Sequence, residues 1–322
     1  MNNCIHIINY FRQGGAENVA YNYIKVLADL GVSSTIIGKP FAETYENRFK
    51  EVATVEYALS NDIIKKANYI FIHSNQGLLR LYKYYSTIKK HNIRVIYIQH
   101  LRYAENKFRI LSKLINTICT DFIQITPITT DLIQKYINIK THFIVNFYLN
   151  RYSESDWNCI RNEIRNKYDI PNDCILVTFS AIFKPGKNLG KFIEIATELQ
   201  NNYNYKFLLI GDGPEAYLIN EYNGNNLIWV GKVNDVEKYL LASDIYLFLS
   251  KIEMMPMALI EAINTNKQII AYDTEINNFL LRNQTFHNIN KYVLQESNIP
   301  NGADLIHYDS KYANTILAKL LG

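Results

Sequence analysis

The stretch that decides the fold is CIHIINYFRQGGAENVAYNYIKVLADLGVSSTIIG, residues 4–38. It contains a buried strand (4–10), a glycine pair, an amphipathic helix (16–31) and a second strand (33–38). A strand, a helix and a further strand in this order form a βαβ unit, whose two strands pair in parallel. The stretch therefore predicts an α/β protein with a parallel sheet covered by helices on both faces.

The same alternation of strands and helices continues along the chain. In the first half, strands are expected at 67–74, 93–100, 121–127 and 141–147, and helices at 77–91, 106–118 and 129–137. In the second half, strands are expected at 174–183, 206–213, 226–231, 244–250 and 268–273, and helices at 188–200, 234–241 and 256–265. Two successive doubly wound sheets are the simplest architecture that fits this pattern.

A polar segment divides the two halves. We expect a first Rossmann-like domain over 1–147, a linker over 148–169 and a second Rossmann-like domain over 170–305. The last segment, 306–322, contains a helix from Ser310 to Leu321 that is expected to cross back to the first domain.

Length and composition fit two globular domains. The chain has 322 residues, 48% of them hydrophobic, and a net charge of only +4, which argues against binding nucleic acid through bulk charge. No stretch approaches the roughly 18–20 apolar residues of a membrane span, and the N-terminal segment does not read as a signal peptide. The cysteines are scattered, so we expect no metal site, no disulfide framework and a cytoplasmic location; they are Cys4, Cys119, Cys159 and Cys174.

Ligands of doubly wound sheets bind beyond the carboxyl ends of the strands, so the residues that follow each predicted strand are candidates for ligand contacts. Gly14 and Gly15 stand before a helix, where bare backbone and the helix N-terminus suit a phosphate. A loop that only needs glycine conformations would give the same pattern. Lys184 and Lys187 follow the first strand of the second half, and they suit either a phosphate or a solvated basic turn.

The stretch SKIEMMPMALIEA (250–262) runs from a strand into a helix and carries two carboxylates. Glu253 lies in the loop, and Glu261 lies eight residues later among apolar residues. A glutamate in such a helix is either exposed or needs a partner such as a ligand hydroxyl. His73 and His100 each end a strand, where a histidine is either structural or part of a binding site.

Together these residues resemble the family 4 glycosyltransferases of the GT-B fold. The resemblance rests on the GGAE loop (14–17), Lys187-Asn188, the GDGP turn (211–214), the stretch 233–250, and Glu253, Pro256 and Glu261. It implies two Rossmann-like domains that face each other across a cleft. It also implies transfer of a sugar from a nucleotide diphosphate sugar, with retention at the anomeric carbon and without a metal or other cofactor.

The resemblance implies a donor-binding role for several residues. Gly14 and Gly15 would place backbone N–H groups near the donor diphosphate. Lys187, together with Lys184, would neutralise the departing diphosphate. Gly231 would lie beside the nucleobase.

The resemblance also implies the catalytic residues, which are Glu253 and His100. Both would contact the donor sugar near the reacting carbon, while Glu261 would bind the donor ribose. The sequence departs from the family at two donor-site positions: Ile182 replaces an arginine, and Met254 replaces a glycine. Ile182 removes a bidentate phosphate contact, and Met254 prevents the same close backbone approach, so both departures predict reduced activity or a shifted donor.

The stretch 80–113 is basic and aromatic, with only Glu105 opposing. Its cations are Arg80, Lys83, Lys89, Lys90, Arg94, Arg102, Lys107, Arg109 and Lys113. Such a face suits contact with an anionic bilayer and a lipid-linked saccharide acceptor, or it is simply solvated. No RNA-binding motif accompanies it.

The leading expectation is a retaining glycosyltransferase of bacterial capsule, O-antigen or exopolysaccharide synthesis, which uses a saccharide or lipid-linked saccharide acceptor. Two alternatives stay open. One is a sugar-nucleotide epimerase of the same two-domain shape, and the other is a non-catalytic partner of another glycosyltransferase, which Ile182 and Met254 would suit.

Overall fold

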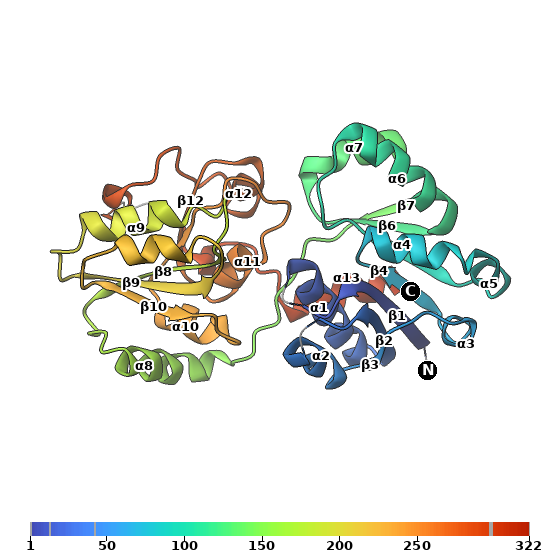
Figure 1. The fold of residues 1–322 in the computed structure, drawn as a ribbon, viewed down its shortest axis with the longest axis horizontal. Helices are drawn as coiled ribbons and strands as arrows, with labels where there is room; N and C mark the ends of the chain where they lie inside the picture. The colour runs from blue at the N-terminus through green and yellow to red at the C-terminus, as the bar shows by residue number, and fades with distance from the viewer. Residues whose placement is uncertain (1, 13, 42, 296–298, 322) are drawn as a thin grey trace. The chain divides into compact units, whose positions relative to one another are not determined.

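The computed structural model describes residues 2–12, 14–41, 43–295 and 299–321, and it divides the chain into two compact units (Figure 1). Unit 1 comprises Met1–Phe147 and Ser310–Gly322, and unit 2 comprises Tyr148–Asp309. Each unit is built on one parallel sheet, so the expected α/β fold with two Rossmann-like sheets is confirmed.

Among its described residues, unit 1 contains a seven-stranded parallel sheet in the order β3-β2-β1-β4-β5-β6-β7. The strands are β1 (Asn2–Tyr10), β2 (Val32–Lys39), β3 (Thr54–Glu56), β4 (Tyr69–Ile72), β5 (Arg94–Ile98), β6 (Asp121–Gln124) and β7 (Lys140–Phe143). The sequence pattern did not predict β3, because it has only three residues. The order reverses between β1 and β4, which marks the switch point of this sheet.

The helices of unit 1 cover both faces of its sheet. They are α1 (Gly15–Asp29), α2 (Glu43–Lys50), α3 (Asn61–Ile64), α4 (Asn75–Tyr82), α5 (Tyr85–Lys90), α6 (Glu105–Ile118), α7 (Thr130–Tyr136) and α13 (Ser310–Leu321), with a 3-10 turn at Pro127–Thr129. Ile5 and Ile7 of β1 pack in one core with residues of α4 to α7, whereas Ile8 packs in another with residues of α1 and α2. The helix expected over 77–91 is therefore two helices, α4 and α5.

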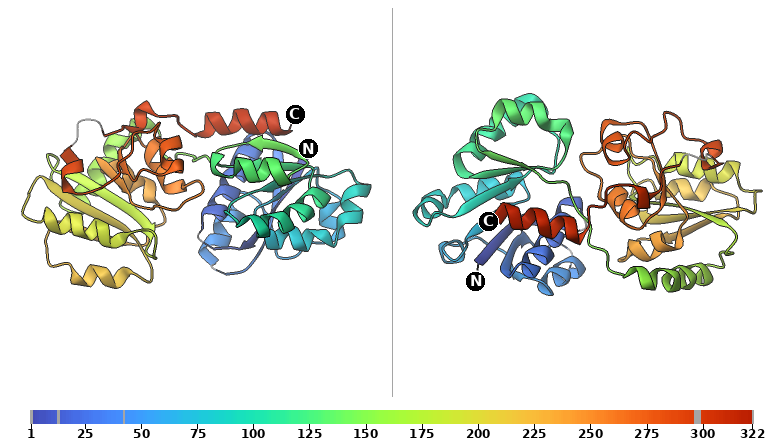
Figure 2. Two further views of the ribbon diagram at one scale, coloured as in Figure 1. Left: turned by 90° about the horizontal axis from the view of Figure 1, so that it is seen from above. Right: turned by 180° about the vertical axis from the view of Figure 1, so that it is seen from behind.

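Helix α13 returns to unit 1 after the whole of unit 2 and packs on α1 (Figure 2). Its last carbonyls accept hydrogen bonds from the sheet: Tyr69 Oη donates to Leu321 O at 3.2 Å, and Arg94 donates to Leu320 O at 2.5 Å. Tyr312 Oη accepts the backbone N–H of Val145 at 3.0 Å. Helix α13 is thus an integral part of unit 1.

Among its described residues, unit 2 contains a five-stranded parallel sheet in the order β10-β9-β8-β11-β12. The strands are β8 (Ile175–Ile182), β9 (Tyr205–Asp212), β10 (Leu227–Gly231), β11 (Ile245–Phe248) and β12 (Gln268–Ala271). The α-helices are α8 (Trp157–Lys167), α9 (Leu189–Glu198), α10 (Val236–Ala242), α11 (Met257–Asn264) and α12 (Glu275–Leu280). Short 3-10 helices lie at Glu154–Asp156, Ala216–Glu221, Lys291–Gln295 and Gly302–Asp304.

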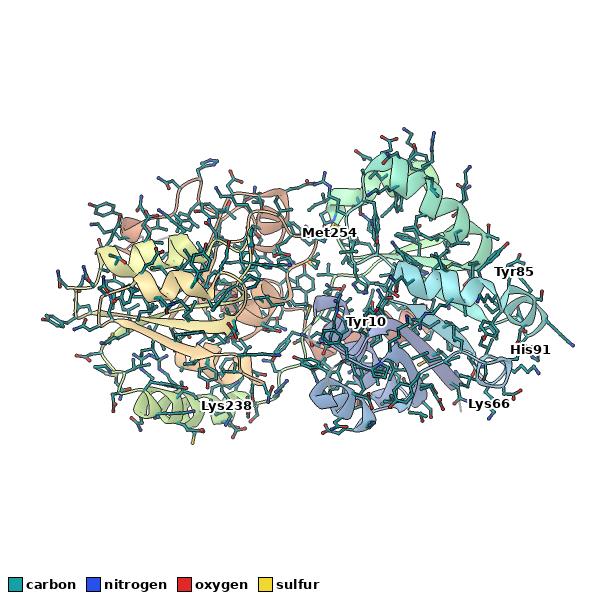
Figure 3. The ribbon with its side chains drawn as sticks, in the orientation of Figure 1. Tyr10, Lys66, Tyr85, His91, Lys238 and Met254 are labelled. Atoms are coloured by element: carbon teal, nitrogen blue, oxygen red, sulfur yellow. The ribbon has the colours of Figure 1, made fainter. Side chains whose placement is uncertain are left out.

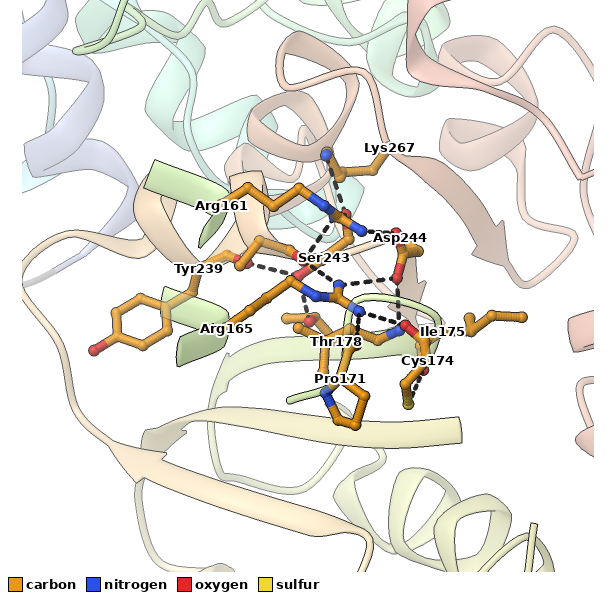
Figure 4. A network of polar contacts seen from close by, with 12 residues as sticks. Arg161, Arg165, Pro171, Cys174, Ile175, Thr178, Tyr239, Ser243, Asp244 and Lys267 are labelled. Atoms are coloured by element: carbon orange, nitrogen blue, oxygen red, sulfur yellow. Dashed lines mark hydrogen bonds and ion pairs between the residues drawn. The ribbon is translucent and has the colours of Figure 1, made fainter. Parts of the chain in front are cut away.

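Residues 148–169, expected as a linker, belong to unit 2 in the structure, because α8 packs on α10. Arg165 of α8 is fully buried and donates to the carbonyls of Ala242, Pro171 and Cys174 (Figure 4). It also pairs with Asp244, to which Arg161 donates at 2.6 Å. These charged hydrogen bonds fasten α8 to the amino end of the sheet, which is why the polar segment is ordered structure.

Candidate functional site

The candidate site in unit 2 lies at the switch point of its sheet, between β8 and β11. The loops that follow these two neighbouring strands leave in opposite directions, and ligands of doubly wound sheets bind there. The loop after β8 carries Lys184 and Lys187, and the loop after β11 carries Glu253 and Met254. The parallel pairing of the strands therefore brings together residues that lie 66 positions apart in the sequence.

Lys187 and Glu253 form an ion pair in which Nζ of the lysine donates to Oε1 of the glutamate. Their side chains are 24% and 21% exposed, so both charges are partly withdrawn from water and still reachable by a ligand. The loop bends sharply to place the lysine, with positive φ at Gly186 (91°) and Asn188 (68°). An ammonium group has three N–H donors, so Lys187 can hold Glu253 and an anionic ligand together.

Glu261 lies one turn inside α11 and is half-buried. Leu259, Ile260, Ala262 and Ile263 are fully buried, whereas Met257 and Ala258 are half-buried, so Glu261 lies on the partly open face of the helix. Burial raises the pKa of Tyr246 on β11, and the charges of Glu261 and Glu253 add to that rise. The two glutamates therefore lie within electrostatic reach of one phenol, whose hydroxyl hydrogen-bonds Ser180 Oγ at 3.0 Å. No sequence motif predicted a role for Tyr246 at this site.

The remaining candidate residues of unit 2 lie at the same carboxyl edge. Gly231 ends β10 with φ of 69°, and Met254 is half-buried in the loop between β11 and α11 (Figure 3). Lys184 is exposed. Ile182, at the end of β8, is 49% exposed, so an apolar side chain faces solvent where the resemblance has an arginine.

The GDGP turn (211–214) has a structural reason to contain glycine at its first position. Gly211 has φ of 129°, and a Cβ at this position would lie 1.9 Å from the carbonyl oxygen of Ala181. Only glycine permits that backbone conformation and that approach. The turn leads into the 3-10 helix Ala216–Glu221.

In unit 1, Gly14 and Gly15 lie where they were expected, at the N-terminus of α1. The side chain of Glu17 folds back over this N-terminus, and a Cβ on Gly14 would lie 2.2 Å from Glu17 Oε2. Burial raises the pKa of Glu17, while its own backbone N–H and Arg12, 3.4 Å away, oppose the rise. The positive end of α1 is thus occupied by a carboxylate of the chain itself, which the sequence pattern did not reveal.

His100 follows β5 in unit 1 and is half-buried. Its Nε2 lies 3.2 Å from Nδ1 of His73, which follows β4. Burial lowers the pKa of His100 to about 4, so the ring is neutral at pH 7. The structure thus pairs the two strand-ending histidines that the sequence singled out.

The candidate residues divide between the units. Gly14, Gly15 and His100 belong to unit 1, and the others belong to unit 2. In the part of the chain that the structure describes, no group of three or more His, Cys, Asp or Glu side chains is arranged to hold a metal ion. No helix among the described residues combines the length and apolar character that a membrane span needs.

Comparison with known proteins relates unit 2 to a known family in sequence and the whole chain to solved structures in fold. Residues 160–308 match the family described as "Glycosyl transferases group 1", so the match covers most of unit 2. No curated protein matches the chain in sequence.

Several solved structures share the fold. Anabaena Alr3699/HepE in complex with UDP and glucose has a TM-score of 0.78 at 13% identity, with coverage of 100% of this chain and 99% of that one. A glycosyltransferase of Rickettsia africae has a TM-score of 0.70 at 15% identity, covering 99% and 93%. A mutant of S. aureus TarM, in complex with Fondaparinux, alpha-GlcNAc-glycerol and UDP, has a TM-score of 0.68 at 11% identity, covering 100% and 99%. The chain therefore has the GT-B fold, and the fold and the family match together support a GT-B glycosyltransferase.

Proposed function

We propose that the chain is a retaining family 4 glycosyltransferase that moves a sugar from a nucleotide diphosphate sugar to a saccharide or lipid-linked saccharide acceptor, in bacterial surface-polysaccharide synthesis. The observation that carries this proposal is the Lys187–Glu253 pair at the switch point of the unit 2 sheet. The family match over 160–308 supports it, as do the complexes of Alr3699/HepE with UDP and glucose and of TarM with UDP.

The opposite charges of Lys187 and Glu253 match the charges that develop when the bond between the sugar and the diphosphate breaks. When the sugar leaves the diphosphate, the phosphate oxygen takes the bonding electrons and becomes more negative, while the sugar becomes more positive. Lys187, with Lys184 in the same loop, stabilises the first charge. Glu253 accepts hydrogen bonds from sugar hydroxyls and stabilises the second.

The other assignments complete the proposal. Glu261 binds the ribose, Gly231 lies beside the nucleobase, and Gly14 and Gly15 approach the diphosphate. His100 contacts the donor sugar. In this proposal lysine side chains neutralise the charge of the departing diphosphate, so the reaction is metal-independent. The departing phosphate accepts the proton of the acceptor's hydroxyl, which attacks the sugar from the face that the phosphate leaves. Attack from that face gives retention at the anomeric carbon.

The test compares three carboxylates of unit 2. Thermal shift with UDP, GDP, ADP and their common sugars identifies the donor, and transfer is then measured with it. We expect Glu261→Gln to raise the donor Kd roughly tenfold or more, as the loss of a charged hydrogen bond does. We expect Glu253→Gln to abolish transfer with less effect on nucleotide binding.

Glu198→Gln is the matched control, because Glu198 is exposed at the end of α9. Full transfer by both site variants would refute the assignment. Inversion at the anomeric carbon in the product would refute the retaining mechanism alone.

Two observations favour one alternative. Ile182 and Met254 replace groups that would contact the donor, as in a non-catalytic partner of another glycosyltransferase. Calorimetry that detects no affinity for any nucleotide sugar would support that alternative. Release of an epimerised sugar without an acceptor would instead identify an epimerase.

We further propose that the protein acts in the cytoplasm, at the inner face of the cell membrane, through the stretch 80–113. Seven of its nine cations are exposed: Lys83, Lys89, Lys90, Arg102, Lys107, Arg109 and Lys113. The other two have structural roles, since Arg80 donates to Ile8 O and Arg94 to Asp121. On α6, Ile110 is 70% exposed among these cations, as expected of a face that lies on a bilayer.

The membrane proposal is tested with vesicles. The triple substitution of Lys107, Arg109 and Lys113 by Glu should abolish sedimentation with vesicles that contain anionic lipid, since each basic residue near such a surface contributes about 1 kcal/mol. The same change at Lys25, Lys65 and Lys66, which are exposed on other segments of unit 1, is the control. Equal sedimentation of wild type with zwitterionic and anionic vesicles would contradict the proposal.

A further inference from the structure

Three histidines of unit 1 form one hydrogen-bonded chain across its sheet. His6 lies in β1, His73 follows β4 and His100 follows β5, and these strands are neighbours in the sheet. Nδ1 of His6 lies 3.1 Å from Nε2 of His73, and Nδ1 of His73 lies 3.2 Å from Nε2 of His100. Each link thus joins Nδ1 of one ring to Nε2 of the next, in one direction along the chain.

The surrounding residues hold the rings in place. The ring of His6 stacks on Phe71, its register partner on β4, at 4.9 Å, and Tyr23 of α1 packs edge-on against His73. The backbone N–H of His73 donates to Ile7 O at 2.9 Å, which extends the pairing of β1 with β4. The exposed fractions of His6 and His73 are 0% and 4%, so neither ring can exchange its partner for water.

Burial keeps the three rings neutral. It lowers the pKa of His6 to about 3 and that of His100 to about 4, and the pKa of His73 lies well below its ordinary value for the same reason. The titratable groups that face the chain are Cys4 on β1 and Tyr23 on α1, and burial raises the pKa of each. All these groups are therefore uncharged at neutral pH.

Neutrality couples the tautomers. A neutral imidazole has one N–H and one lone pair, and each link needs one of each. If His100 donates from Nε2, His73 must accept at Nδ1 and donate from Nε2 to His6. If His100 carries its proton on Nδ1, the other two rings must do the same. The three rings therefore share two states, which differ in whether Nδ1 of His100 carries a proton.

The hydrogen-bonded series of histidine rings continues beyond His6. Nε2 of His6 lies 3.4 Å from Sγ of Cys4, and that sulfur lies 3.1 Å from Oγ of Ser34 on β2. Burial raises the pKa of the Cys4 thiol to about 12, so the thiol keeps its proton and can donate or accept. Both shared states therefore have a partner at this end, and neither leaves a buried ring nitrogen unsatisfied.

We propose that His73 and His6 are positioning residues that fix the tautomer of His100, with the proton on Nε2 of all three rings. Nδ1 of His100 then presents a lone pair and no proton. This inference rests on the proposed function, in which His100 contacts a sugar that becomes positive as its bond to the diphosphate breaks. A lone pair stabilises that charge, whereas an N–H dipole would oppose it.

The coupling is tested in the wild-type protein without any assay of activity. Nitrogen-15 spectra of histidine-labelled protein distinguish protonated from unprotonated ring nitrogens at pH 7.5 and pH 5.5. Single His→Gln variants assign the seven histidines. We expect His6, His73 and His100 to be neutral at both pH values, with the proton on Nε2. Protonation of any of them at pH 5.5, or different tautomers within the chain, would overturn the proposal.

The positioning role is tested with a pair of substitutions of similar branched shape. His73→Asn keeps an amide oxygen that can accept from Nε2 of His100, whereas His73→Leu has no acceptor. We expect His73→Leu to lower kcat about tenfold relative to His73→Asn, the usual effect of one lost hydrogen bond, with little change in donor KM. The Leu variant should also show both tautomers of His100. His91→Leu, at the exposed end of α5, is the control (Figure 3).

Equal kcat in the Asn and Leu variants would overturn the positioning role even if the tautomers are coupled. Absence of transfer by the wild type would instead refute the proposed function, and with it the role at His100. The spectra would still decide whether the three rings are coupled.

Discussion

Lowering the pH from 7 to 5 is expected to destabilise unit 1 through its buried histidines. In the folded protein the pKa of His6 is about 3 and that of His100 about 4, against an ordinary value of 6.5. Below pH 6.5 the unfolded chain therefore binds protons that the folded chain does not. The contribution of these histidines to the unfolding free energy is therefore fully present above pH 6.5, the ordinary pKa of histidine. It is lost as the pH falls from there toward the pKa values of the folded protein.

The size of the loss follows from the interval between pH 6.5 and pH 5. One pKa unit corresponds to about 1.36 kcal/mol, so about 1.5 units remove about 2 kcal/mol per histidine. His6 and His100 together remove about 4 kcal/mol, and His73 acts in the same direction. That is a large part of the roughly 5–15 kcal/mol that stabilises an ordinary domain. Burial raises the pKa of Glu17, so this carboxyl acts in the opposite direction to the histidines.

The assay must resolve unit 1. Both tryptophans, Trp157 and Trp229, lie in unit 2, so hydrogen exchange of peptides from β1, β4 and β5 is the suitable measurement. Opening free energies at pH 7 and pH 5, corrected for the intrinsic exchange rate, are compared in wild type and His6→Phe. We expect the variant to lose about 2 kcal/mol less than wild type over this range, because one titrating group is gone. The Glu17 contribution cancels in the difference.

The exposed residue His91 provides the control, since His91→Phe should leave the acid loss unchanged. Equal acid losses in wild type and His6→Phe would show that the buried rings do not carry the effect. The reasoning about their neutrality would then be refuted.

Three further predictions concern unit 2. Gly211→Ala should lower the unfolding free energy, measured by tryptophan fluorescence, by about 3 kcal/mol or more, because φ is 129° and the new Cβ would clash with Ala181 O. Gly190→Ala is the control and should not destabilise the protein, because a Cβ on Gly190 would have no neighbour within 4 Å. Arg165→Met should cost about 3–5 kcal/mol in urea unfolding because it removes the hydrogen bonds of a buried guanidinium to Asp244 and to three carbonyls. Lys167→Met on the exposed face of α8 should cost less than about 1 kcal/mol. Lys187→Met should weaken nucleotide diphosphate binding about tenfold or more in calorimetry and change the unfolding free energy by less than about 1 kcal/mol. Lys191→Met is the control and should change neither quantity, because the ion-pair partner of Lys191, Glu194, is exposed. Unchanged binding in Lys187→Met would remove Lys187 from the donor site.

Much of the fold could be predicted from local sequence. The strands are apolar and rich in β-branched residues, and the helices show an apolar face, so most elements lie within a few residues of their predicted ranges. The helix Ser310–Leu321 of the prediction has the bounds of α13 in the structure. Short elements were missed because their local patterns are weak: β3 has three residues, and α2, α3 and α12 have four to eight. The break between α4 and α5 was missed for another reason, since Tyr84 lies there and its hydroxyl donates to the distant Leu59 O.

The contacts of the candidate site could not be predicted in this way. Lys187 and Glu253 were singled out separately, but their pairing depends on β8 and β11 being neighbours, which no local pattern states. The histidine chain joins residues 67 and 27 positions apart for the same reason. Glu17 was quoted only as part of a motif, because the fold-back of its side chain depends on three-dimensional packing.

The return of α13 to unit 1 has a consequence for synthesis of the protein. A ribosome completes unit 2 before it releases the helix that finishes unit 1, so the first half of the chain emerges with part of its surface uncovered. During that interval Arg94 and Tyr69 lack the carbonyls of Leu320 and Leu321. A released chain that ends at residue 309 should therefore be cut by protease in unit 1 while unit 2 resists, whereas in the full chain α13 (Ser310–Leu321) should protect unit 1 as well.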